Sequence, residues 1–324
     1  MVYGKDRQQD WSHGALRGEL LRRLKAVAAS LGMTAMLLCS GPRAASAYCR
    51  TRTCGERCTF DENGCAVEGE PIAWSNACVS YGVQKDGVPS ISREELVQAT
   101  DAAFRAWQEA RCPSNAQPSI SVYDLFGVVA CRRAEYNGLA PNANIVMLRD
   151  AWEEDDGVLA LTTVSYATAS GEIYDADIEV NATLPITAGP LGPDLFDLQS
   201  ILTHEAGHFL GLDHSSKGLA DKCVGGATMC KTYPPGLDDF RTLDVDDVAA
   251  ICAVYPPERN PPACDPTPRK GFSAECAMDP LRGGGCSLSI CPSRVSNVAT
   301  IAITVGCSLV AGRRRARARL QKRT

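Results

Sequence analysis

Histidine is scarce in this chain, and its distribution constrains the fold more than any other feature of the sequence. Among 324 residues there are four histidines, and three of them, His204, His208 and His214, lie within eleven residues. Residues four apart share one face of a helix, so the first two can present ring nitrogens to one ion. Gly211 tolerates the positive φ at which helices end, and the chain can then turn and return His214. The spacing predicts a helix, a sharp turn and a metal site.

Glu205 lies beside the first histidine and suits a general base. Three protein ligands leave one position of a tetrahedral zinc ion to water, which is typical of a catalytic site. Zinc lowers the pKa of such water to about 7, and the Glu205 carboxylate could accept its proton. The alternative is a chance pattern on a buried helix, which the added glycine and third histidine disfavour. We expect one Zn²⁺ held by His204, His208 and His214, with Glu205 as the catalytic residue.

The whole motif, followed by a methionine turn at Met229, is similar to that of the metzincin zinc endopeptidases. Ser215, directly after the third histidine, resembles the matrixin branch, the relatives of the matrix metalloproteinases. Residues 171–181 resemble the strand before the active-site helix of bacterial matrixins, and residues 243–256 resemble their last helix. The resemblance covers residues 72–257. It implies an α+β, metzincin-like zinc-protease domain with a twisted, mixed five-stranded sheet and about three helices, in which Met229 is a packing floor beneath the ligands.

The same resemblance indicates where a protein or peptide substrate would lie. A substrate strand would pair with the edge at residues 158–162, which contains Leu159 and Ala160. Tyr233 and Pro234, in the loop that follows the methionine turn, would wall the pocket for the residue after the scissile bond. The alternative for this loop is a proline-rich surface segment.

Two features of the animal relatives are missing or weak here. Matrix metalloproteinases carry a structural zinc built on further histidines, and this chain has none to spare. The acidic run at residues 153–156 could hold Ca²⁺, because carboxylate oxygens suit that ion, although a solvated loop is the commoner outcome. Residues 52–55 faintly resemble the cysteine switch that keeps the animal enzymes latent. We favour the alternative that Cys54 forms a disulfide.

The N-terminal region is typical of a signal peptide over residues 1–47. Basic residues 22–25 precede an apolar core at residues 26–38 and a small-residue cleavage site at residues 45–47. An amphipathic first helix is the alternative. We expect export to the cell surface or beyond, with Tyr48 as the new N-terminus.

Cysteine usage agrees with export. Twelve cysteines lie between residues 48 and 279, an even number that permits complete pairing. Residues 48–71 are predicted to be a cysteine-rich, disulfide-stapled extension that packs on the main domain. Cys223 and Cys230 flank the approach to Met229, and a local bridge between them is our hypothesis.

The charge of the body of the chain excludes one class of partner. Between residues 48 and 293 there are 18 basic and 35 acidic side chains, a net charge of −17. Such acidity argues against nucleic-acid binding and favours a soluble exported protein. We expect a monomer.

The C-terminal region changes composition twice. Residues 258–292 are rich in Pro, Gly and Cys, as in a linker. In the tail at residues 293–324, an apolar stretch at 295–312 precedes an arginine cluster, which predicts membrane contact. With the Gly-Cys-Ser at residues 285–287, this tail resembles a MYXO-CTERM sorting signal; a plain single-span anchor is the alternative.

Hydrophobic periodicity predicts the following elements: strands at residues 74–83, 120–122, 144–147, 159–166 and 175–180, and helices from the Ser92 capping box to near Arg111, at 194–210 and at 244–255. We expect a secreted or surface-anchored zinc endopeptidase. The alternative is a surface-displayed binding or adhesion protein that keeps zinc for structure, which has no need of a general base at Glu205.

Overall fold

The computed structural model describes residues 48–155, 157–215, 226–276 and 298–303. Its centre is a sheet with the spatial order β5-β6-β4-β2-β3, in which β5 is antiparallel to β6 and the other pairs are parallel. This confirms the predicted mixed five-stranded sheet. The strands are β2 (Cys78–Gln84), β3 (Ser121–Val129), β4 (Ile145–Arg149), β5 (Ala160–Ala167) and β6 (Ile173–Asn181).

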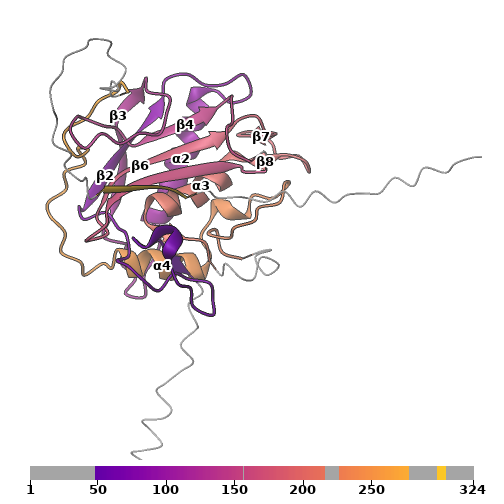
Figure 1. The fold of residues 1–324 in the computed structure, drawn as a ribbon. Helices are drawn as coiled ribbons and strands as arrows, with labels where there is room; N and C mark the ends of the chain where they lie inside the picture. Colours follow the sequence, from indigo (N-terminus) through magenta and orange to yellow (C-terminus); the bar gives the residue numbers. More distant parts are fainter. Residues whose placement is uncertain (1–47, 156, 216–225, 277–297, 304–324) are drawn as a thin grey trace, which may run out of the picture. The chain divides into compact units, whose positions relative to one another are not determined.

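The helices cover the face of the sheet on which alternate, apolar side chains of the strands lie. Along β5, Ala160, Val164 and Tyr166 point to one face and belong to the main core. Helices α2 (Arg93–Gln108) and α3 (Leu198–Phe209) cover this face (Figure 1). The third helix, α4 (Val245–Val254), follows the site and completes the set of three that the resemblance implied.

Helix α2 begins where its capping box indicates, whereas α3 begins at Leu198, four residues after the predicted start at residue 194, because Phe196–Asp197 form a strand. Ser92 Oγ accepts a hydrogen bond from the Glu95 amide, and the Glu95 carboxylate accepts from the Ser92 amide, which completes the expected capping box. Trp107 Nε1 donates to the Thr203 carbonyl at 2.8 Å, and this bond joins the end of α2 to the middle of α3.

Several short strands and 3₁₀ helices precede and follow α3 or pair with the segments beside it. The extension contributes β1 (Cys49–Arg50), which pairs antiparallel with β9 (Leu212–Asp213) just before the third histidine. Ahead of α3, β7 (Ile186–Thr187) pairs in parallel with β8 (Phe196–Asp197). The remaining short elements are the 3₁₀ helices η1 (Gly55–Arg57) and η3 (Asp239–Arg241).

Five disulfides join described residues, which confirms the disulfide-rich character of the domain. The Cys54–Cys58 bridge shows that Cys54 is not a free thiol, so the faint switch resemblance of residues 52–55 is wrong and the disulfide alternative holds. Cys230 is disulfide-bonded, but its expected partner Cys223 lies outside the described residues. The other bridges are Cys49–Cys65, Cys78–Cys264, Cys112–Cys252 and Cys131–Cys276.

The start of the expected linker is folded onto the domain. Disulfides at Cys264 and Cys276 hold it, and the Ala130 amide donates to the Ala274 carbonyl at 2.7 Å. Phe272 stacks on Phe126 with ring centroids 4.2 Å apart. Residues 258–276 therefore pack on the domain rather than extend from it as a stalk.

The described part of the tail that was expected to span a membrane is a strand of the sheet. Residues Val298–Ile303 form strand β10, which pairs antiparallel with β5 as a sixth strand at the edge of the sheet. Within the described ranges, no helix is long and apolar enough to cross a bilayer. The resemblance to a sorting tail is not supported, and the rest of residues 293–324 and all of residues 1–47 lie outside the described chain.

Candidate active site

Helix α3 carries the first two predicted ligands and ends where glycine permits. Asp197 caps its N-terminus through a hydrogen bond from the Ser200 amide at 2.8 Å. Gly211 has φ +92°, and a Cβ there would lie 2.5 Å from the Ile72 carbonyl oxygen. A glycine is therefore required at the turn that leads through β9 to His214.

The structure brings the three predicted histidines together. Their ring nitrogens lie within 4.8 Å of one another, and all three side chains are buried. The Nε2 atoms of His204 and His208 are 3.2 Å apart. Two nitrogens bound to one tetrahedral zinc ion at 2.0–2.1 Å would be separated by about 3.3 Å, so the spacing of this pair fits such an ion.

The hydrogen bonds of two rings orient them for a cation. His204 Nδ1 lies 2.6 Å from the Thr228 carbonyl oxygen, and His208 Nδ1 lies 2.9 Å from the Leu212 carbonyl oxygen. Carbonyls only accept, so each Nδ1 carries the proton and each Nε2 presents a lone pair. Burial and the neighbouring His208 lower the pKa of His204 to about 3, which keeps that ring neutral. Two facing lone pairs repel each other unless a cation lies between them, and the residues present fit zinc.

Glu205 follows His204 on α3 and is buried. Its side chain is 2% exposed, and its carboxylate Oε2 accepts a hydrogen bond of 2.6 Å from Thr162 Oγ1 on β5. Burial raises the pKa of Glu205 to about 8, and the bond from Thr162 opposes that rise. A dication held by the histidines would favour the ionised carboxylate. The sequence pattern identified Glu205 but not Thr162, which lies 43 residues away.

Met229 packs against α3 at Gly207. It is buried, and a Cβ on Gly207 would lie 2.8 Å from Trp107 Cζ2 and closer still to Met229 Sδ. The Met229 carbonyl accepts from the Ser215 amide at 2.9 Å, which ties the turn to the residue after the third ligand. This geometry agrees with a packing floor and explains a glycine inside the motif.

Asp247 on α4 holds the methionine turn, and the sequence analysis missed it. Its carboxylate accepts hydrogen bonds from the amides of Thr228 at 2.6 Å, Met229 at 3.1 Å and Asp244 at 2.9 Å. Burial outweighs these bonds and raises the pKa of Asp247 to about 6. Asp244 at the N-cap and Asp247 three residues on form a capping box, a sequence signal that predicts the bond to Asp244 but not the bonds to the turn.

The four residues predicted to line a substrate pocket lie on two segments of the chain. Leu159 and Ala160 are buried at the start of β5, close in sequence to Thr162. Tyr233 is buried and stacks on Phe240 at 4.8 Å, and the Phe240 ring lies parallel to His204 at 6.4 Å. Pro234 is exposed. Tyr233 and Phe240 thus form a stacked aromatic pair that extends toward His204.

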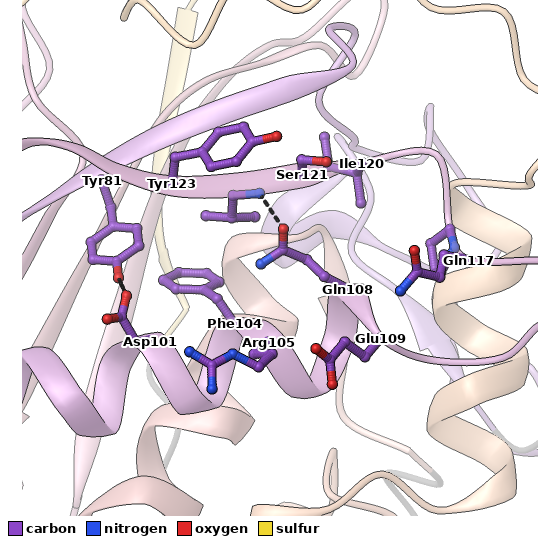
Figure 2. Close-up of a pocket in the computed structure, with 12 residues that line it drawn as sticks. Tyr81, Asp101, Phe104, Arg105, Gln108, Glu109, Gln117, Ile120, Ser121 and Tyr123 are labelled. Atoms are coloured by element: carbon purple, nitrogen blue, oxygen red, sulfur yellow. Dashed lines mark hydrogen bonds between the residues drawn. The ribbon is translucent and has the colours of Figure 1, made fainter.

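A separate cavity lies elsewhere on the domain. Figure 2 shows it between α2 and β3, with a volume of about 360 Å³. Its lining includes the Tyr81 hydroxyl and the Asp101 carboxylate, which are 2.5 Å apart, and Gln108, whose side-chain oxygen accepts from the Val122 amide. None of the predicted site residues lines it.

Comparison with known proteins agrees with this site. The chain is 26% identical over 202 residues to matrix metalloproteinase-16 of Rattus norvegicus, covering 60% of this chain and 29% of that protein. It is 27% identical over 191 residues to matrix metalloproteinase-20 of Homo sapiens, covering 59% of this chain and 34% of that protein. The chain therefore spans about a third of the length of these curated relatives. Residues 149–256, which include the histidine triad, match the family model for Matrixin, so over this stretch the chain is similar to the matrixin family.

Proposed function

We propose that this protein is an exported zinc-dependent endopeptidase. The observation that carries the proposal is the convergence of His204, His208 and His214 on one point, with Glu205 beside them. A structural zinc site normally closes with four protein ligands, and among the residues that the structure describes this cluster offers three. The Glu205 carboxylate, which follows the first of these histidines in the chain, suits a general base.

The residues divide the work of peptide hydrolysis among them. When bound by the three imidazoles, zinc supplies a Lewis acid that polarises the peptide carbonyl and acidifies water. Glu205 accepts a proton from the attacking water while the water oxygen bonds to the carbonyl carbon of the peptide. As the carbon–nitrogen bond breaks, Glu205 passes that proton to the leaving amine. Met229 stays beneath the ligands and contributes packing alone.

The substrate would lie in extended form along the edge of β5. Strand β10 pairs with Thr162–Ala167 of that edge, so Leu159, Ala160 and Leu161 lie beyond its register. Their main-chain groups could pair with a peptide by strand addition. The wall of Tyr233 and Pro234 would then bound the pocket for the residue after the scissile bond, with Phe240 between Tyr233 and the metal ligands.

Export rests on the signal-like residues 1–47 and on the five disulfides, which persist in oxidising compartments. Calcium at residues 153–156 stays a prediction, and a rise in Tm on adding calcium would support it. The monomeric state also stays a prediction, which light scattering would test.

Replacing Glu205 by Ala tests the proposed function. The purified wild-type protein should digest casein, lose that activity to 1,10-phenanthroline and regain it with added zinc. The E205A protein should bind one zinc per chain, measured by mass spectrometry of the metal, because Glu205 is not a ligand. It should show no digestion, because the proton acceptor is lost.

A second glutamate variant serves as the matched control for E205A. Glu109, exposed at the end of α2, is remote from the histidines in sequence, and E109A should digest casein at the wild-type rate. Digestion by E205A at the wild-type rate would refute the assigned role. A wild-type protein that binds zinc and never cleaves peptides would instead favour the binding or adhesion alternative.

A further inference from the structure

The hydroxyl of Thr162 makes a contact that the proposed mechanism does not yet use. Thr162 lies on β5 and is fully buried. Its Oγ1 is 2.6 Å from Glu205 Oε2 and 3.3 Å from the Glu205 carbonyl oxygen. The shorter contact lies in the range of strong hydrogen bonds from a hydroxyl to a carboxylate, so the single proton of Oγ1 goes to Oε2.

This contact is not needed to hold the sheet together. Thr162 pairs with Ile178 of β6 through the main chain, and its side chain instead crosses to α3. The neighbouring Thr163 points to the opposite face by strand alternation and shows the same residue type without the contact. Within the described ranges, Thr162 is the only side chain recorded as a donor to the Glu205 carboxylate.

A glutamate side chain has three rotatable bonds, so its carboxylate does not hold one orientation by itself. The bond from Thr162 occupies Oε2 and leaves Oε1 to receive a proton. Because Thr162 is on the sheet and Glu205 is on the helix, the bond also fixes the distance between the substrate edge and the base. Proton transfer requires donor and acceptor within about 2.6–3.2 Å, so a carboxylate that rotates spends time out of reach.

We propose that Thr162 is a positioning residue for the general base: its hydroxyl holds one carboxylate oxygen of Glu205 and thereby directs the other toward the attacking water. This inference rests on the proposed endopeptidase function. Thr162 acts through Glu205 and has no direct role toward the substrate carbonyl. Its contribution should therefore fall on the chemical step and not on substrate binding.

The test is a comparison of kcat and KM for three variants with a fluorogenic peptide that the wild-type protein cleaves. Thr162→Val keeps the branched shape and removes the hydroxyl, and we expect about a tenfold fall in kcat with KM within about twofold. Thr162→Ser restores a hydroxyl and should stay within about threefold of the wild-type kcat. Thr163→Val is the matched control and should leave both constants unchanged.

The outcomes separate this inference from the proposed function. If the wild-type protein shows no zinc-dependent cleavage, the endopeptidase proposal fails and this inference fails with it. If the wild-type protein is active and T162V retains full kcat, only the positioning role is overturned. A fall in T162V that appears equally in T162S or T163V would also overturn it, because such a loss reports packing and not the hydroxyl.

A second pair of variants covers the case in which T162V does not fold. Zinc content and the near-ultraviolet circular dichroism spectrum are measured for each protein before kinetics. Thr162→Ala and Thr162→Ser then differ by the hydroxyl oxygen alone. A folded, zinc-loaded T162A with low kcat beside an active T162S supports the inference, and equal kcat values refute it.

Discussion

The close packing of Gly207, on α3, against Met229 predicts how much stability a larger side chain at position 207 would cost. A Cβ at position 207 would lie 2.8 Å from Trp107 Cζ2 and closer to Met229 Sδ, whereas carbon atoms in good contact are about 3.5–4.0 Å apart. Gly207→Ala therefore forces Met229 or the buried Trp107 to move. Overpacking of this kind costs about 1–3 kcal/mol. Replacing glycine by alanine inside a helix returns about 0.5–1 kcal/mol.

The net loss for G207A should be about 1–2 kcal/mol. For a domain of this size, that loss lowers Tm by about 2–8 °C. Met229→Ala alone leaves a cavity and should cost about 2–5 kcal/mol. In the double variant the new methyl group enters space that Met229 has vacated, so its cost should be lower than the sum of the two single costs by about 1 kcal/mol or more.

The assay is urea unfolding of the four proteins with their disulfides intact, followed by tryptophan fluorescence and far-ultraviolet circular dichroism. Bound metal stabilises the folded state by mass action, so every curve is measured both with chelator and with saturating zinc. Additivity of the single variants to within about 0.5 kcal/mol would refute the packing argument. A G207A protein as stable as the wild type would refute it as well.

Two further predictions concern the supports of the site. Burial raises the pKa of Asp247 to about 6, above its ordinary value of 3.8, so its contribution to stability is fully present below pH 3.8 and is lost as the pH rises through about 6. Asp247→Asn should therefore remove this pH dependence from the free energy of unfolding, measured in urea between pH 4 and 7. An unchanged pH dependence would contradict the assignment to Asp247. Removing the Cys112–Cys252 bridge with two serines should cost about 2–5 kcal/mol, because the bridge joins residues 140 apart in sequence. Thermal unfolding checks this, and a Tm equal to that of the wild type would show that packing alone holds these segments.

Local patterns predicted the elements and the chemistry of the ligands. The spacing of His204, His208 and Gly211 requires a helix and a turn, and the structure has both. The capping box at Ser92 predicts the start of α2. These signals succeed because hydrogen bonds and side-chain faces in helices and strands repeat over a few residues, so the interacting groups are close in sequence.

The C-terminal region shows where local patterns were insufficient. Residues 258–276 have no periodicity, and composition alone predicted a linker. Disulfides and strand-like hydrogen bonds to distant residues hold this segment on the domain. The sequence of β10 is apolar, and apolar side chains are typical both of a strand in a sheet and of a membrane-spanning segment. Composition therefore could not distinguish the two.

The sequence by itself predicted the histidine triad that the structure brings together, the proposed base Glu205 and the order of the main strands and helices along the chain. Only the tertiary structure decided which groups orient them: Thr162 reaches Glu205 from β5, and Asp247 reaches the methionine turn from α4. These partners are separated from their targets by many residues, and any of several polar side chains could make such a bond. Which one does so depends on how the sheet and the helices pack, because a hydrogen bond requires its atoms within about 3 Å.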